Sequence, residues 1–281
     1  MCNTFILYFN KKRAKMTEAI LKKIKQLPPL PESAMQIEAV YQDPNSTFND
    51  MVKILEKDPL LTADILKAAN SPLYGFSREI TAISQAVGLF GMGTVRGFAL
   101  ASIVKKSFNL DLSPYGITDE MFSELSKKQN ALVTSWCLRK ENRLMGVLSP
   151  AAFLVEIGKV LIAQQIMADN KEAEFRDALA ELQDVEAAEK EIVGVDTPEV
   201  SATIFEQWKF EENLVDVIRN AQEPQNAADE DKKAAQILKV VRVAVPINGK
   251  VTPESVEAAK ALIEEYDLDM ESFDKAIEAF L

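Results

Sequence analysis

Residues 27–75 read LPPLPESAMQIEAVYQDPNSTFNDMVKILEKDPLLTADILKAANSPLYG, a series of helical segments separated by proline. The Pro-Pro-Leu-Pro run must be extended, because proline has no N–H for a helix interior and biases the preceding residue away from α. Thr47 and Asp50 have the spacing of a capping box. Asp58 can cap a helix whose first turn begins with Pro59. The stretch therefore predicts three helices.

The rest of the chain continues this helical pattern. Apolar residues recur three and four positions apart, as on one face of a helix. The segments with this pattern are residues 17–27, 81–90, 94–108, 119–141, 152–166, 171–193, 197–208, 210–222, 231–245, 253–266 and 271–280. We expect Ser149-Pro150 to open the helix over 152–166 and the acidic segment 171–193 to face solvent. No alternating run is bounded by hairpin turns, so the sequence predicts an all-α fold.

Composition narrows the classes of protein. The chain has 281 residues, of which 47% are hydrophobic and 27% charged, a net charge of −11 and no histidine. No apolar run approaches the ~20 residues of a bilayer span, so we expect no membrane association. The basic cluster from Lys11 to Lys25 is short for a phosphate-binding face, so we expect no nucleic acid as a partner. Cys2 and Cys137 form no disulfide framework, which favours a cytoplasmic location.

The N-terminus places a short apolar run before basic residues. A secretory signal has the reverse order. We therefore expect residues 1–16 to be a flexible arm, with either Met1 or Met16 as the true start.

Four motifs follow one another in the first part of the chain. They are LPPLP at 27–31, DPLLT at 58–62, ANS at 69–71 and ITAISQAVGLFGMGTVRGFALAS at 80–102. In this order and at this spacing they resemble the start of the HDOD domain, a bacterial relative of the HD and HD-GYP phosphohydrolases. The resemblance extends over about residues 21–224.

The resemblance implies an HD-domain-like helical bundle with an N-terminal helical lobe. The HDOD domain would then span residues 17–224, with the N-terminal lobe over 17–110 and the HD-like lobe over 117–224. Residues 220–231 have the composition of a flexible junction. Residues 225–281 are expected to form a C-terminal helical extension.

Catalytic HD relatives bind metals through spaced histidine and aspartate residues. The corresponding positions here are Gln129, the pair Val155-Glu156, Thr197, and then Ala221 and Gln222. Transition-metal sites of this kind need imidazole donors, and this chain has none. The resemblance is therefore to a degenerate member, for which we expect no catalytic residue, no metal and no cofactor.

Glu156 is the one carboxylate left at these positions. A single carboxylate is too few for Mg²⁺ or Ca²⁺, which need several oxygen ligands. We expect Glu156 either to be a partly buried polar residue or to pair with a Lys or Arg, and Lys159, three residues later on the same helix face, is one candidate partner. Gly158 is expected to allow close backbone approach. Gly91-x-Gly93 has no preceding strand, so it predicts a tight turn between helices rather than a phosphate loop.

The function expected first is that of a non-catalytic module of bacterial signal transduction that acts through protein–protein contacts. The resemblance implies partners in two-component or cyclic-di-GMP pathways and roles in motility or biofilm formation. Two alternatives remain open. One is a residual metal-dependent phosphohydrolase, and the other is a nucleotide sensor that uses the ancestral pocket.

Overall fold

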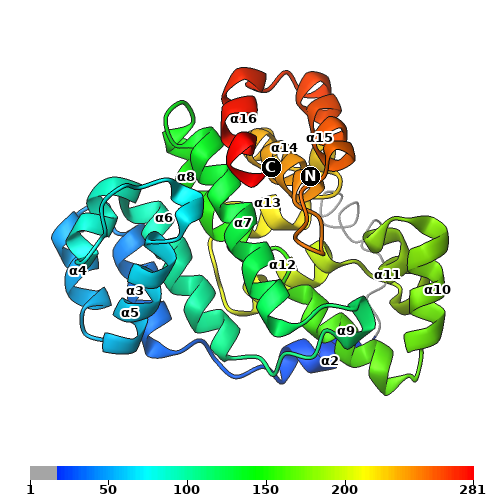
Figure 1. Cartoon of the computed structure of the whole chain (residues 1–281). Coiled ribbons are helices and arrows are strands. Elements are labelled where there is room, and N and C mark those ends of the chain that lie inside the picture. The colour runs from blue at the N-terminus through cyan, green and yellow to red at the C-terminus, as the bar shows by residue number, and fades with distance from the viewer. Residues whose placement is uncertain (1–17) are drawn as a thin grey trace, which may run out of the picture.

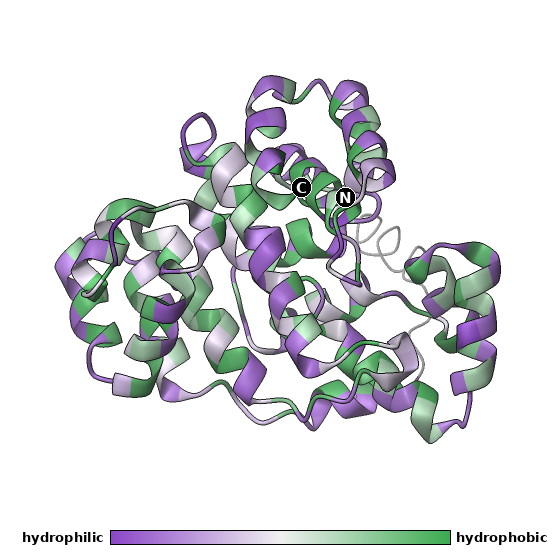
Figure 2. Ribbon diagram, in the orientation of Figure 1, coloured by the Kyte–Doolittle hydropathy of each residue, from purple (hydrophilic) through white to green (hydrophobic). Residues whose placement is uncertain are grey.

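The computed structural model describes residues 18–281, and over that range it contains α-helices and short 3₁₀ turns but no strand (Figure 1). The predicted all-α fold is confirmed. The expected N-terminal arm over 1–16 lies outside the described residues. Figure 2 shows hydrophobic and hydrophilic residues alternating along outer helices such as α10 (Glu172–Leu182) and α15 (Pro253–Glu265). Such alternation is typical of helices with one face on a core.

The N-terminal helices are α2 Glu18–Lys25, α3 Glu32–Gln42, α4 Phe48–Leu55, α5 Pro59–Ala69, η1 Pro72–Tyr74 and α6 Ile83–Lys106. Two of them, α4 and α5, begin where their predicted caps place them. Thr47 and Asp50 form the predicted capping box at the start of α4. Asp58 accepts the backbone N–H groups of Leu60 and Leu61, both at 3.0 Å. Helix α2 packs on α9 and α12, while α3–α6 pack on one another.

The second group of helices forms the HD-like lobe. Its elements are η2 Ser113–Tyr115, α7 Asp119–Cys137, η3 Asn142–Leu144, α8 Met145–Leu154, α9 Gly158–Ala168, α10, α11 Val185–Val193, α12 Thr197–Gln207, α13 Glu212–Arg219 and η4 Pro224–Asn226. Helices α8 and α9 are buried along nearly their whole length, and α7, α12 and α13 pack around them.

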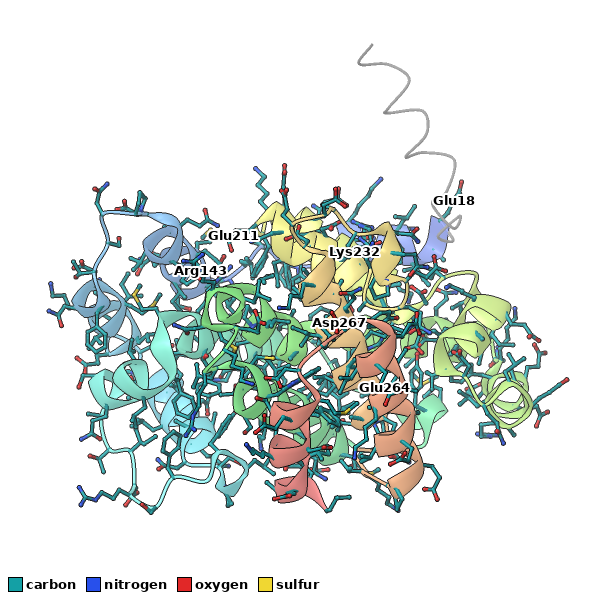
Figure 3. All side chains as sticks on the ribbon, turned by 90° about the horizontal axis from the view of Figure 1, so that it is seen from above. Glu18, Arg143, Glu211, Lys232, Glu264 and Asp267 are labelled. Atoms are coloured by element: carbon teal, nitrogen blue, oxygen red, sulfur yellow. The ribbon has the colours of Figure 1, made fainter. Side chains whose placement is uncertain are left out.

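The C-terminal helices pack onto this lobe. They are α14 Lys232–Ala244, α15, α16 Met270–Ile277 and η5 Glu278–Phe280. Helix α14 packs against α7, α8 and α13, and the Trp136 indole donates to the backbone oxygen of Asp269 at 2.9 Å. Figure 3 shows Lys232 at the start of α14, Glu264 in the last turn of α15 and Asp267 in the turn that follows α15. The expected junction over 220–231 is folded, because it includes η4 and a hydrogen bond from the Ala228 N–H to Asp216 at 2.9 Å.

The helix that was expected to begin at Ser149-Pro150 begins earlier in the structure. Helix α8 begins at Met145 and contains Pro150 in its interior. Proline cannot donate to the carbonyl four residues earlier, and that carbonyl, on Gly146, accepts instead from Arg96 at 3.1 Å. The expected single helix over 152–166 is also wrong, because α8 ends at Leu154 and α9 starts at Gly158.

Helix α6 contains the tight turn predicted at Gly91-x-Gly93. Gly91 has φ +79° and ψ 162°, which interrupts the helical backbone between its two halves. A residue with a Cβ is strained at this φ, so glycine suits the position. Beyond the turn, a Cβ on Gly93 would lie 2.7 Å from the Cα of Gly146. Helices α6 and α8 therefore touch backbone to backbone.

Two segments are long and apolar enough to span a membrane by length and composition, contrary to the expectation from the sequence. They are Ile83–Lys106 and Asn142–Ala168, and 61% and 94% of their most apolar windows are buried inside the protein. A central core helix and a membrane helix have similar average hydropathy, so this composition is accounted for by burial in the core.

A buried arginine joins the two lobes. The Arg96 guanidinium on α6 contacts both carboxylate oxygens of Glu38 on α3 at 2.7 Å. It also contacts Glu211, next to α13, at 2.7 Å, and lies 4.2 Å from the centre of the Tyr41 ring. These residues come from the N-terminal and HD-like lobes, so this cluster fixes one lobe against the other.

Candidate functional site: a buried ion-pair cluster

The site is built at the break between α8 and α9. The Ser201 hydroxyl, from α12, donates to the Val155 carbonyl at 2.6 Å and accepts the Gly158 N–H at 2.8 Å. A side chain inserted into the helical hydrogen-bond ladder is a recognised cause of such breaks. A Cβ on Gly158 would lie 2.6 Å from the Thr197 carbonyl, so the predicted close approach is confirmed.

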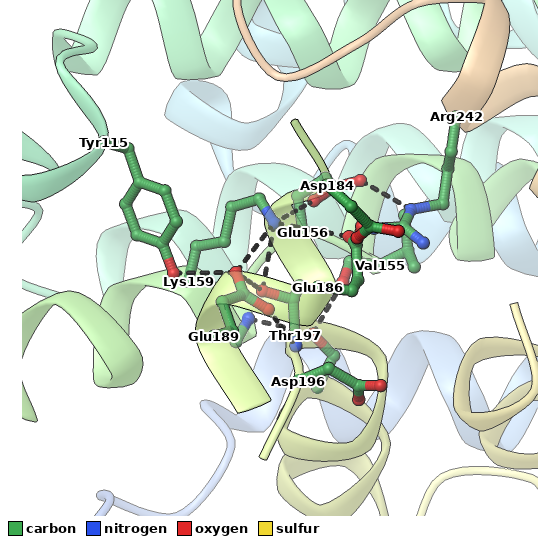
Figure 4. Close-up of polar contacts among 12 residues, drawn as sticks. Tyr115, Val155, Glu156, Lys159, Asp184, Glu186, Glu189, Asp196, Thr197 and Arg242 are labelled. Atoms are coloured by element: carbon green, nitrogen blue, oxygen red, sulfur yellow. Dashed lines mark hydrogen bonds and ion pairs between the residues drawn. The ribbon is translucent and has the colours of Figure 1, made fainter. Parts of the chain in front are cut away.

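Glu156 lies at this break and contacts two cations (Figure 4). One carboxylate oxygen is 2.7 Å from Arg242 Nε, and the other is 3.1 Å from Lys159 Nζ. The predicted pairing of Glu156 with Lys159 is therefore confirmed. Burial alone would raise the pKa of Glu156, but Arg242 and Lys159 outweigh it and lower that pKa to about 2. Glu156 is thus a stable carboxylate in the protein interior.

Lys159 connects Glu156 to a second carboxylate, Glu189 on α11. Its ammonium is 3.1 Å from Glu189 and 3.0 Å from the Thr197 hydroxyl. Glu189 also accepts the Thr197 N–H at 2.6 Å and the Tyr115 hydroxyl at 2.8 Å (Figure 4). The Lys159 and Glu189 side chains are 1% and 0% exposed, so all these contacts are shielded from water.

A third carboxylate, Glu186, completes the cluster. It pairs with the guanidinium of Arg242 and lies 3.8 Å from Lys159 Nζ. Burial raises the pKa of Glu189, and the negative charge of Glu186 raises it further. The cluster thus has three carboxylates and two cations, and Glu189 also accepts hydrogen bonds from Tyr115 and Thr197.

Most of the chain matches a known protein family. Residues 27–224, well over half of the chain, match the model of the HDOD domain. The chain belongs to the HDOD domain family. The resemblance inferred from the sequence is therefore confirmed.

Solved structures share the fold of this HDOD protein along nearly its whole length. A virulence factor from Campylobacter jejuni subsp. jejuni is 28% identical with a TM-score of 0.56, and the match covers 96% of this chain and 97% of that one. A Marinobacter aquaeolei VT8 protein, whose name proposes a role in signal transduction, is 22% identical with a TM-score of 0.66. That match covers 97% of this chain and 62% of the other.

A curated relative matches a smaller part of the HDOD chain. It is an uncharacterized protein of Treponema pallidum (strain Nichols), 30% identical over 78 residues. The match covers 28% of this chain and 15% of the relative's length.

The structure brings together some of the positions that were predicted to correspond to HD metal ligands. Glu156 and Thr197 both contact Lys159, and the amide nitrogen of Gln129 is 3.4 Å from Glu156. Val155 is adjacent, and its backbone carbonyl bonds to Ser201. Ala221 and Gln222 do not join the cluster. Ala221 is buried after α13 with its N–H on the Ile218 carbonyl, and Gln222 is half-buried beside it.

Three charged members of the cluster were not identified from the sequence. Glu186 and Glu189 lie in the acidic segment expected to face solvent, and that expectation is wrong for both, since their side chains are 14% and 0% exposed. They are three residues apart on the inner face of α11. The other side chains on that face are mostly short. The sequence could have predicted a buried ion pair at Arg242, because this residue is a single cation inside an apolar run and such a cation is buried only when it is paired.

The cluster residues do not fit the transition metals of HD enzymes. None of the donors is imidazole, and each carboxylate already contacts Lys159 or Arg242. Two surface hollows of the described residues, one beside Trp136 and Lys233 and one beside Ser113 and Arg176, are not lined by any member of the cluster. A metal ion would have to displace both cations.

Proposed function

We propose that this HDOD protein is a non-catalytic module of bacterial signal transduction that acts by binding other proteins. One observation carries the proposal. The ammonium of Lys159 and the guanidinium of Arg242 lie between the three buried carboxylates, at the positions where a catalytic relative would need metal and substrate. With no imidazole to act as a base or ligand, and with its charges internally paired, the cluster has the features of a structural core.

Family membership supports the signalling part of the proposal. HDOD domains resemble hydrolase domains but occur in signalling proteins, and one structural neighbour is named for signal transduction. The proposed partners are proteins of two-component or cyclic-di-GMP pathways, in the cytoplasm, with no nucleic acid and no membrane contact. The output would then depend on a folded surface and not on turnover.

A turnover assay and partner capture test the proposal together. The purified protein is incubated with bis-p-nitrophenyl phosphate and with cyclic dinucleotides, each with Mn²⁺ or Mg²⁺, beside the variant E156Q. We expect no release of product above the metal-only background. Tagged protein from the native cells should instead retain specific signalling proteins. Metal-dependent turnover that disappears in E156Q would establish the phosphohydrolase alternative in place of the adaptor function.

A further inference from the structure

The C-terminal segment reaches into the site from outside the matched domain. The family model ends at residue 224, yet Arg242 on α14 contacts Glu156 at 2.7 Å. The carbonyl of Val245, just after α14, accepts from Gln129 at 3.1 Å. The carbonyl of Gly249 accepts from Lys128 at 2.7 Å. The segment over residues 232–250 therefore contacts two degenerate HD positions directly.

Apolar packing alone does not account for this arrangement. The larger buried apolar residues of α14, which already attach it to the lobe, are Ile237, Leu238, Val240 and Val241. The Arg242 side chain is only 8% exposed, and burying a guanidinium is unfavourable unless its charge is matched. Without Arg242, three carboxylates would share the single ammonium of Lys159. Arg242 is thus required by the charges of the site.

We propose that residues 232–250 form an internal plug of the HD-like lobe, with Arg242 as a built-in cationic ligand for Glu156 and Glu186. The plug occupies a site whose chemistry selects a guanidinium group, since its Nε meets Glu156 and a terminal nitrogen meets Glu186. The inference rests on the proposed function in that no external ligand is needed at the site. Its test measures stability and not turnover, so either claim can fail alone.

Chemical rescue tests the plug. We expect R242A to lower the Tm by roughly 10 °C, because it leaves three buried carboxylates with only the ammonium of Lys159. Millimolar guanidinium chloride should raise the Tm of R242A in a saturable manner, because the ion can enter the vacated space. Sodium chloride or tetramethylammonium chloride at the same ionic strength should not raise the Tm of R242A, since neither cation donates N–H groups. Wild-type protein should show no such increase.

A matched control is R219A. Arg219 also pairs with two carboxylates, Glu199 and Glu206, but its side chain is 21% exposed and Glu206 is 52% exposed. Guanidinium should therefore not rescue R219A. The proposal would be overturned by any of three results: equal rescue of R219A, rescue of R242A by tetramethylammonium, or a wild-type Tm for R242A. So would a folded, destabilised R242A on which guanidinium has no effect.

A double variant covers the case in which R242A does not fold. R242M/E186Q removes the cation together with one of its carboxylates and keeps the apolar volume. It should yield more soluble protein and a higher Tm than R242M. If R242M/E186Q is no better than R242M, the charge of Arg242 is not what the site requires, and the proposal fails.

Discussion

At Glu156 a single carboxylate contacts two cations in the protein interior. Such a carboxylate is strongly stabilised while both cations are present, and its loss leaves them incompletely paired. Glu189 differs, because it is held by hydrogen bonds from Tyr115 and Thr197 as well as by Lys159. Both carboxylates are thus held by contacts within the protein.

The variant E156Q should lower the free energy of unfolding by about 3 kcal/mol, as expected when one partner of a buried ion pair is removed. Urea unfolding measures this difference. The control is E271Q, whose pair with Lys275 is exposed and screened by solvent, so its loss should change stability little. Equal stability of E156Q and E271Q would show that the buried pairs contribute no more than a surface pair.

The acid limb of stability should also depend on Glu156. Its pKa falls from 4.5 to about 2 on folding. A carboxyl with a lowered folded-state pKa contributes stability above its unfolded pKa, and this contribution is lost as the pH falls through the folded value. Between pH 4.5 and pH 2 the wild-type protein should therefore lose stability more steeply than E156Q. Parallel pH profiles of the two proteins in urea unfolding would contradict the assignment.

For the helices, features that depend on neighbouring residues could be predicted from the sequence, whereas features that depend on residues far apart in the chain could not. The caps of α4 and α5 depend on residues two or three positions apart, so the sequence predicted them. The start of α8 was missed because Pro150 is tolerated only where Arg96, far away in the chain, binds the freed carbonyl. The sequence did not show which face of α11 is buried, because Lys159, which pairs with the buried Glu189, lies on another helix.

The contact between α9 and α12 depends on Gly158. G158A should destabilise the protein by about 1–3 kcal/mol, since the new methyl group would lie 2.6 Å from the Thr197 carbonyl and 2.8 Å from the Ser201 hydroxyl. The matched control is G88A in α6, where a Cβ meets no atom within 4 Å. Alanine there should raise stability by about 0.5–1 kcal/mol through helix propensity. Thermal unfolding that shows the same sign for both variants would contradict this account.

At the scale of the whole molecule, the Arg96 cluster makes the two lobes one unit. Glu38 binds Arg96 through both oxygens, whereas Glu211 is more exposed and uses one. We expect one cooperative unfolding transition, with E38Q costing about 3 kcal/mol and E211Q about 1 kcal/mol. Calorimetry measures both. Two separate transitions in the wild-type protein, or a larger effect of E211Q, would show that the lobes are not joined in this way.

We propose that Lys159 and Arg242 stand in place of a metal beside Glu156, and metal stoichiometry tests this proposal most directly. The protein is purified without chelator, dialysed against Mn²⁺, Fe²⁺ or Zn²⁺, and measured by inductively coupled plasma mass spectrometry beside E156Q. The account predicts far less than one metal ion per chain, with no difference between the two proteins. One ion per wild-type chain that is lost in E156Q would contradict it.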